Sequence, residues 1–163
     1  NSYGSAGQTT RYDDLSIKMA TRADLFMTRD VGSANVRVGV KVSNVLYYPC
    51  GIVLCADDAT NPQNFILAIV EPYDNSAGLR HYVDVYKFVN GTMSTVVFNI
   101  LAGNQEDDVL FEAEHAAGVL RLYYKGVQIG TDYSVTDAEI VSNTRHGLFN
   151  ADSSNSMTEF SIE

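Results

Sequence analysis

The segment at residues 56–64 concentrates oxygen-bearing side chains between two apolar runs. Asp57, Asp58, Asn61 and Asn64 bring two carboxylates and two amides into nine residues. Calcium takes several oxygen ligands of this kind, so we expect Asp57, Asp58 and Asn61 to hold Ca²⁺. The spacing lacks the central glycine and terminal glutamate of an EF-hand loop. The alternative is an Asx-rich turn that binds nothing. We interpret the acidic stretch at 106–108 as a solvated turn.

A second group of polar and aromatic residues follows the alternation of a predicted strand at 81–90. Tyr82, Asp84 and Tyr86 occupy every other position and therefore share one face. Sugars offer hydroxyls to carboxylates and amides, and C–H faces to aromatic rings, so these three side chains are candidates for carbohydrate binding. Tyr48 and Asn64 are further candidates. The alternative is that the rings lie in the core with their hydroxyls at the rim, and the absence of tryptophan disfavours a flat stacking platform.

Catalytic patterns are weak. Glu112-Ala-Glu114 places two carboxylates on one strand face, as retaining glycosidases require. A catalytic strand of the Glu-x-Asp-x-Glu type also carries a middle carboxylate, which is absent here. We interpret the pair as an exposed polar edge. The sequence has three histidines but no Gly-x-Ser-x-Gly motif that would supply a nucleophilic serine. No phosphate-binding glycine loop and no dinucleotide-binding motif is present. We therefore expect no catalytic residues and no enzyme activity.

The two cysteines are predicted to be free, buried thiols. Cys50 and Cys55 lie five positions apart on one predicted strand, which should point them to opposite faces. Their Cα atoms would then be about 16 Å apart, beyond the roughly 7 Å limit for a disulfide.

Short strands are predicted throughout, about ten to twelve of them, with no long helix. The apolar runs 51–55 and 65–70 form a pair that belongs at the middle of a sheet. In the segment 35–45 four valines alternate with polar or small residues. Residues 72–78 are interpreted as a turn cluster, and Asn90-Gly91 as a hairpin turn. This pattern predicts an all-β fold, a sandwich of two antiparallel sheets.

Length and charge limit the number of domains and the classes of partner. The 163 residues fit one domain, which we place at residues 13–163 after a small, polar linker or extension at 1–12. The net charge is −9 and no basic cluster occurs, so nucleic acid is a poor candidate partner. No apolar run is long enough to insert into a membrane.

The order of the motifs resembles the concanavalin A-like lectin/glucanase jelly roll, including its laminin-G-like relatives. The matching pieces, in chain order, are Asp30-Val-Gly32 with the strand 35–42, the Gly-Ile-Val strand at 51–53 and its Asp/Asn loop, Tyr86 to Gly91, Gly118 to Val127, His146-Gly-Leu-Phe149 and the closing Glu-Phe-Ser-Ile strand at 159–162.

This resemblance implies a non-catalytic carbohydrate-binding module attached to other domains of a larger extracellular or phage tail protein. Its partner would be a polysaccharide or other glycan, and a structural calcium ion would lie near a loop. The resemblance leaves both a monomer and an oligomer as alternatives. Extracellular or virion-surface localisation follows as an expectation. The alternatives are a jelly-roll spacer or assembly domain without a sugar ligand and, at lower weight, a glycan hydrolase or lyase.

Overall fold

The computed structural model describes residues 2–3, 9–11, 16–18, 25–75 and 78–163. All regular elements in these ranges are β-strands, so none of the described chain forms a helix that could cross a membrane. The strands are β1 (Ser2–Tyr3), β2 (Thr9–Arg11), β3 (Ser16–Lys18), β4 (Leu25–Asp30), β5 (Val36–Ser43), β6 (Cys50–Ala56), β7 (Phe65–Asn75), β8 (Gly78–Val89), β9 (Thr92–Asn104), β10 (Val109–Ala116), β11 (Val119–Tyr124), β12 (Val127–Ser134), β13 (Arg145–Asn150) and β14 (Ser156–Ile162). Most of the predicted linker at 1–12 lies outside the described residues.

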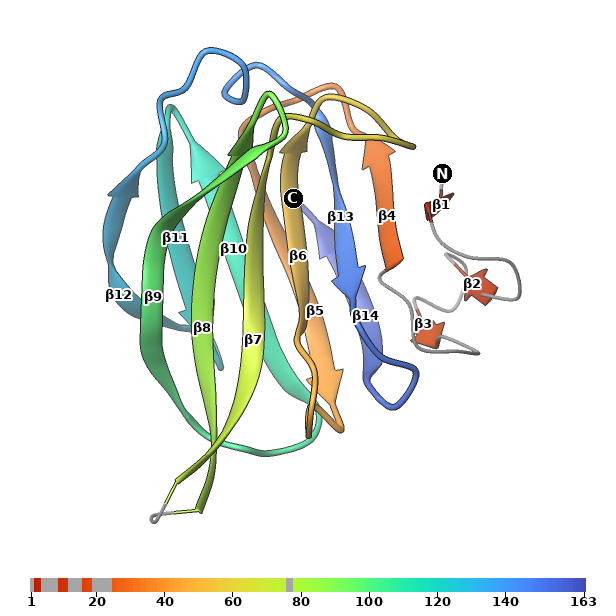
Figure 1. Ribbon diagram of the computed structural model, residues 1–163, viewed down its shortest axis with the longest axis vertical. Helices are drawn as coiled ribbons and strands as arrows, with labels where there is room; N and C mark the ends of the chain where they lie inside the picture. The colour runs from red at the N-terminus through yellow and green to blue at the C-terminus, as the bar shows by residue number, and fades with distance from the viewer. Residues whose placement is uncertain (1, 4–8, 12–15, 19–24, 76–77) are drawn as a thin grey trace.

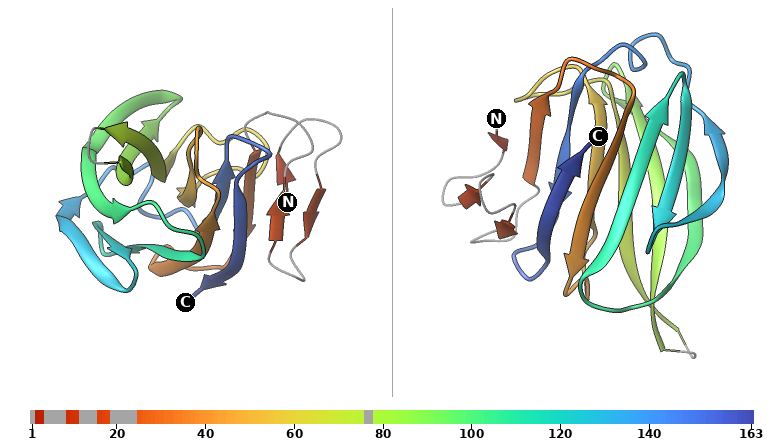
Figure 2. Two further views of the ribbon diagram at one scale, coloured as in Figure 1. Left: turned by 90° about the horizontal axis from the view of Figure 1, so that it is seen from below. Right: turned by 180° about the vertical axis from the view of Figure 1, so that it is seen from behind.

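Two antiparallel sheets face each other, as the strand pattern predicted. The first sheet has the order β1-β4-β13-β6-β7-β8-β9, and the second has the order β12-β11-β10-β5-β14-β3-β2. The strands of the two sheets form the front and back layers of the molecule (Figure 1), and the view from below separates the layers (Figure 2). The core lies between them, as expected for a sandwich whose strands bury alternate side chains.

The valine alternation of β5 is confirmed. Val38, Val40 and Val42 are fully buried in the core, whereas Arg37 and Lys41 point to the outer side of the second sheet. β5 pairs with β10, where Phe111 and Ala113 continue the buried face.

The pair β6 and β7 occupies the middle of the first sheet, also as predicted. All seven residues of β6 are buried, because one side faces the core and the other side is covered by neighbouring side chains. Gly147 of β13, the strand between β4 and β6, allows close packing against β4. A Cβ at Gly147 would approach the backbone oxygen of Met27 to 1.7 Å, so only glycine fits between these strands.

The prediction of a turn cluster at 72–78 is wrong for residues 72–75 and 78, which belong to strands, and residues 76–77 lie outside the described residues. β7 continues through Pro72 to Asn75 and pairs with β8 along its whole length, which makes a long hairpin that extends beyond the rest of the sheet (Figure 1). β6 pairs with β7 only as far as Val70. Beyond that point β7 has one open edge, where a strand tolerates proline because fewer ladder hydrogen bonds are needed.

The prediction that Cys50 and Cys55 point to opposite faces is also wrong, although both are free and buried as expected. Both side chains belong to the core between the sheets. Cys55 has a left-handed backbone (φ 54°), and the β6–β13 register shifts beside it, between Arg145 and Gly147. This irregularity breaks the strict alternation and returns Cys55 to the inner side.

Candidate functional site

The outer face of β7, β8 and β9, directed away from the second sheet, gathers polar and aromatic side chains. Val83 and Val85 of β8 point into the core, so Tyr82, Asp84 and Tyr86 lie on the opposite side. The sequence prediction that these three share a face is therefore consistent with the observed strand.

Neighbouring strands add side chains to this face. In the β7–β8 register, Glu71 lies opposite Tyr82 and Tyr73 lies opposite Arg80. On the other side of β8, Leu101 of β9 lies opposite Tyr82. Cross-strand neighbours of this kind are within contact distance, so residues from three strands surround Tyr82.

A small hollow lies at the centre of this group. Tyr73, Tyr82 and Asn99 line a space of about 220 Å³. The rings of Tyr73 and Tyr82 meet edge to face, with centroids 5.5 Å apart. Tyr73 is 57% exposed, so its ring is available to a ligand.

Asp84 lies beneath this surface and organises it. Asp84 is only 1% exposed to solvent. One carboxylate oxygen accepts a hydrogen bond from the backbone N–H of Asn99 at 2.7 Å, and the other accepts one from the hydroxyl of Tyr86 at 3.1 Å. Asn99 has a left-handed backbone (φ 59°) at an irregular part of β9. The carboxylate thus fixes both the irregularity and the Tyr86 ring.

The electrostatics of this face are determined by two neighbouring carboxylates, those of Glu71 and Asp84. Burial, reinforced by the charge of Asp84, raises the pKa of Glu71 above its ordinary value. Burial also raises the pKa of Tyr86 to about 12, with Asp84 adding to the effect. Tyr86 therefore stays a neutral hydroxyl at physiological pH.

The remainder of the same face is filled by its own apolar side chains. Phe65 and Phe88 stack with centroids 4.3 Å apart, and Phe26 meets Phe65 edge to face at 5.4 Å. Tyr48, a predicted sugar-binding residue, packs against this apolar cluster. Open polar surface on this face is consequently found around Tyr73 and Tyr82 rather than around Phe65.

Asn64, the fifth predicted sugar-binding residue, links two loops. Its side-chain oxygen accepts a hydrogen bond from the backbone N–H of Asn90 at 2.7 Å, and its amide donates to Asp57 at 2.7 Å. Asn64 thus joins the 57–64 loop to the turn between β8 and β9, at the opposite end of β7 from Tyr73. The structure does not bring it together with Tyr82 and Asp84.

The predicted calcium ligands mainly organise their own loop. Asp57 accepts hydrogen bonds from the backbone of Gln63 and Asn64, and Asp58 accepts them from Thr60 and Asn61. The backbone bonds from Thr60 and Asn61 lower the pKa of Asp58 to about 2. This arrangement is the Asx turn considered as the alternative. Within the described ranges, no group of three His, Cys, Asp or Glu side chains could hold a metal ion. Calcium binding at Asp57, Asp58 and Asn61 stays a prediction.

Glu112 and Glu114 lie on the outer face of the second sheet, and the expectation of an exposed edge is wrong. β10 is an interior strand between β5 and β11, and each carboxylate has a basic partner. Glu112 pairs with Arg37 at 2.9 Å, and Glu114 pairs with Arg121 at 2.8 Å.

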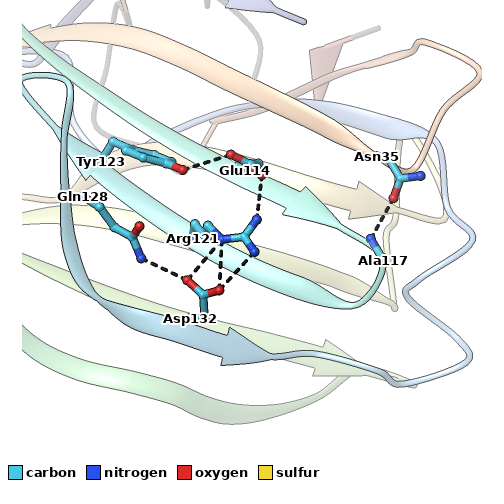
Figure 3. A network of polar contacts seen from close by, with 7 residues as sticks. All are labelled: Asn35, Glu114, Ala117, Arg121, Tyr123, Gln128 and Asp132. Atoms are coloured by element: carbon cyan, nitrogen blue, oxygen red, sulfur yellow. Dashed lines mark hydrogen bonds and ion pairs between the residues drawn. The ribbon is translucent and has the colours of Figure 1, made fainter.

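Figure 3 shows the surroundings of Glu114 in that network. The hydroxyl of Tyr123 donates to its second oxygen at 3.0 Å, and Arg121 also reaches Asp132 at 3.0 Å. Arg37 lies over the Tyr123 ring at 3.9 Å from the centroid. These contacts engage both carboxylates with charged or hydroxyl partners.

Sequence reasoning missed Glu71, Tyr73 and Asn99. The alternation Ile69, Glu71, Tyr73 could have indicated the outer face of a continuing strand, but Pro72 suggested a turn. Asn99 reaches the site through an irregularity in β9, for which the sequence offers no pattern.

Comparisons with known proteins establish the fold. No protein-family model matches the chain, and no curated protein matches its sequence. Among solved structures, a carbohydrate-binding module, CBM66 from Bacillus subtilis, matches with TM-score 0.63 and 11% identity, over 99% of this chain and 94% of that one. The Caenorhabditis elegans galectin LEC-6 matches with TM-score 0.58 and 9% identity, over 95% and 99%. CG-16, a homodimeric agglutinin from chicken liver, matches with TM-score 0.55 and 12% identity, over 86% and 100%.

The chain therefore has the concanavalin A-like jelly-roll fold that its motifs predicted. At these identities the likeness concerns the fold alone. The function must be argued from the side chains on the face of β7–β9.

Proposed function

We propose that this chain is a non-catalytic, lectin-like carbohydrate-binding module whose ligand occupies the outer face of β7, β8 and β9. The observation that carries the proposal is the hollow lined by Tyr73, Tyr82 and Asn99. The exposed ring of Tyr73 and the partly buried ring of Tyr82 offer a surface to the C–H face of a sugar. The adjoining carboxylate of Glu71 can accept hydrogen bonds from sugar hydroxyls, which charged acceptors strengthen.

The fold and the strands that carry the site support the proposal. Solved structures with this fold include a carbohydrate-binding module and an agglutinin by name. The residues that surround the hollow come from three adjacent strands, which form a rigid support for the side chains. Side chains on a rigid platform lose little conformational entropy when a ligand binds, so a weak ligand has a smaller entropy loss to offset.

The non-catalytic role is part of the proposal. The carboxylates that most resemble a glycosidase strand, Glu112 and Glu114, are on the other sheet and are engaged by Arg37 and Arg121. Attachment to a larger extracellular or virion protein is proposed from the motif resemblance and the acidic composition.

A glycan array probed with the purified chain, with and without calcium, tests this proposal. We expect binding to a restricted set of glycans. A requirement for calcium would support the predicted ion site at 57–61. If no glycan binds under either condition, the spacer or assembly alternative replaces the lectin-like function.

A further inference from the structure

Two carboxylates of the proposed sugar face have no basic partner among the residues that the structure describes. Glu71 and Asp84 are diagonal neighbours on adjacent strands, because Glu71 lies opposite Tyr82 and Asp84 lies opposite Ile69. No ion pair to either carboxylate is found among the described residues. This differs from the second sheet, where Glu112 and Glu114 each contact an arginine.

The nearest basic side chain along β8 is occupied elsewhere. Arg80 donates a hydrogen bond to the side-chain oxygen of Asn104, on β9. Lys87 belongs to the inner side, where its ammonium contacts Asp137 at 2.7 Å. Neither cation neutralises the Glu71–Asp84 pair through a direct contact.

Aromatic rings surround the two carboxylates. Tyr73 and Tyr82 meet beside Glu71, and Tyr86 contacts Asp84 through its hydroxyl. The face of a tyrosine ring attracts cations because of its quadrupole, and the attraction grows when the cation is partly desolvated. Carboxylates and ring faces together are the features that recognise an ammonium group. An anionic ligand would meet repulsion from both carboxylates.

We propose that this site selects glycans that carry a protonated amino group, with Glu71 as the specificity-determining residue. The inference depends on the proposed carbohydrate-binding function and assigns the ligand class of that same face. The ammonium lies between Glu71 and the rings of Tyr73 and Tyr82. Asp84, which is almost fully buried, contributes through its charge and holds Tyr86 in place.

The test uses three hexasaccharides of equal length: β-1,4-glucosamine with free amines, its N-acetylated form, and oligogalacturonate. Each is titrated into the whole chain by calorimetry at about pH 5.5, where sugar amines are protonated. An array carrying glucosamine- and galactosamine-containing glycans with free amines extends the test to other stereochemistries. We expect at least about tenfold tighter binding of the amine form than of the N-acetylated form, and no binding of the galacturonate.

Glu71→Gln keeps the shape of the side chain and removes its charge. We expect this variant to lose most of the amine preference, and we expect the preference to weaken with added salt because the interaction is electrostatic. Glu114→Gln, on the opposite sheet, is the matched control and should keep the preference.

Two results would overturn the inference while leaving the proposed function intact. One is binding of neutral glycans as tight as that of every amine-bearing glycan tested. The other is an amine preference that Glu71→Gln leaves unchanged. Absence of binding to any glycan, neutral or charged, would instead overturn the proposed function together with this inference.

Discussion

The carboxylate of Asp84 is predicted to stabilise the site and the fold at once. Replacing Asp84 with alanine removes the acceptor of two hydrogen bonds, one from the backbone of Asn99 and one from the hydroxyl of Tyr86. Tyr86 is partly buried, and its hydroxyl can turn to water. The Asn99 N–H, held by the left-handed backbone at the irregularity in β9, has no other acceptor in the described contacts.

The magnitude follows from these contacts. A hydrogen bond to a charged group contributes roughly 1.5–3 kcal/mol. The loss is opposed by relief of the repulsion between Asp84 and Glu71, which is visible in the raised pKa of Glu71. We therefore expect Asp84→Ala to lower the free energy of unfolding by about 2–3 kcal/mol. Asp84→Asn, which keeps one oxygen acceptor, should lower it by less.

Urea denaturation followed by fluorescence or circular dichroism measures this loss. Asp132→Ala is the control, because Asp132 also bonds a neighbouring strand but is exposed on the second sheet, where ion pairs contribute little. The reasoning would be refuted if Asp84→Ala were no more destabilising than Asp132→Ala. It would also be refuted if Asp84→Ala kept full glycan affinity, since Tyr86 would then not depend on Asp84 for its position.

Two further predictions concern the core. Gly147→Ala should prevent folding or strongly lower the melting temperature, because its Cβ would overlap the backbone of β4. Gly126→Ala, at a turn with open space around it and φ of 75°, should cost only about 1–2 kcal/mol for the left-handed backbone; equal effects on the two melting curves would contradict this account. Burial lowers the pKa of His81 and of His146 in the folded chain, so the unfolded chain takes up protons more readily below about pH 6.5. Their contribution to stability is therefore complete above pH 6.5 and is lost as the pH falls through the folded pKa values. The urea midpoint should be lower at pH 5.5 than at pH 7.5, and an unchanged midpoint would show that these histidines are not held neutral by burial.

The strand pattern could be predicted because periodicity is a local property of the sequence. The valines of β5 alternate without interruption, and the two apolar runs of β6 and β7 are long enough to indicate a buried pair. Left-handed residues interrupt such periodicity without a clear sequence signal. Strict alternation therefore predicts Cys55 on the face opposite Cys50, although its backbone turns it into the same core.

The candidate site could be predicted only where one strand supplies it. Tyr82, Asp84 and Tyr86 alternate within β8, so their shared face follows from the sequence. Glu71 and Asn99 join them through strand register and an irregularity, which no single segment encodes. Pro72 further concealed the extension of β7, since an open strand edge that tolerates proline is visible only after the strands are paired.

Removal of the exposed ring at the hollow tests the central claim most directly. Tyr73 is 57% exposed, so Tyr73→Ala should leave the melting temperature nearly unchanged. Calorimetry with the tightest glycan found on the array should show affinity reduced about tenfold or more, as expected when a sugar loses a ring contact. Tyr123→Ala, on the opposite sheet, should bind that glycan as the wild type does. Unchanged affinity in Tyr73→Ala, or an equal loss in Tyr123→Ala, would contradict sugar binding on the face of β7–β9.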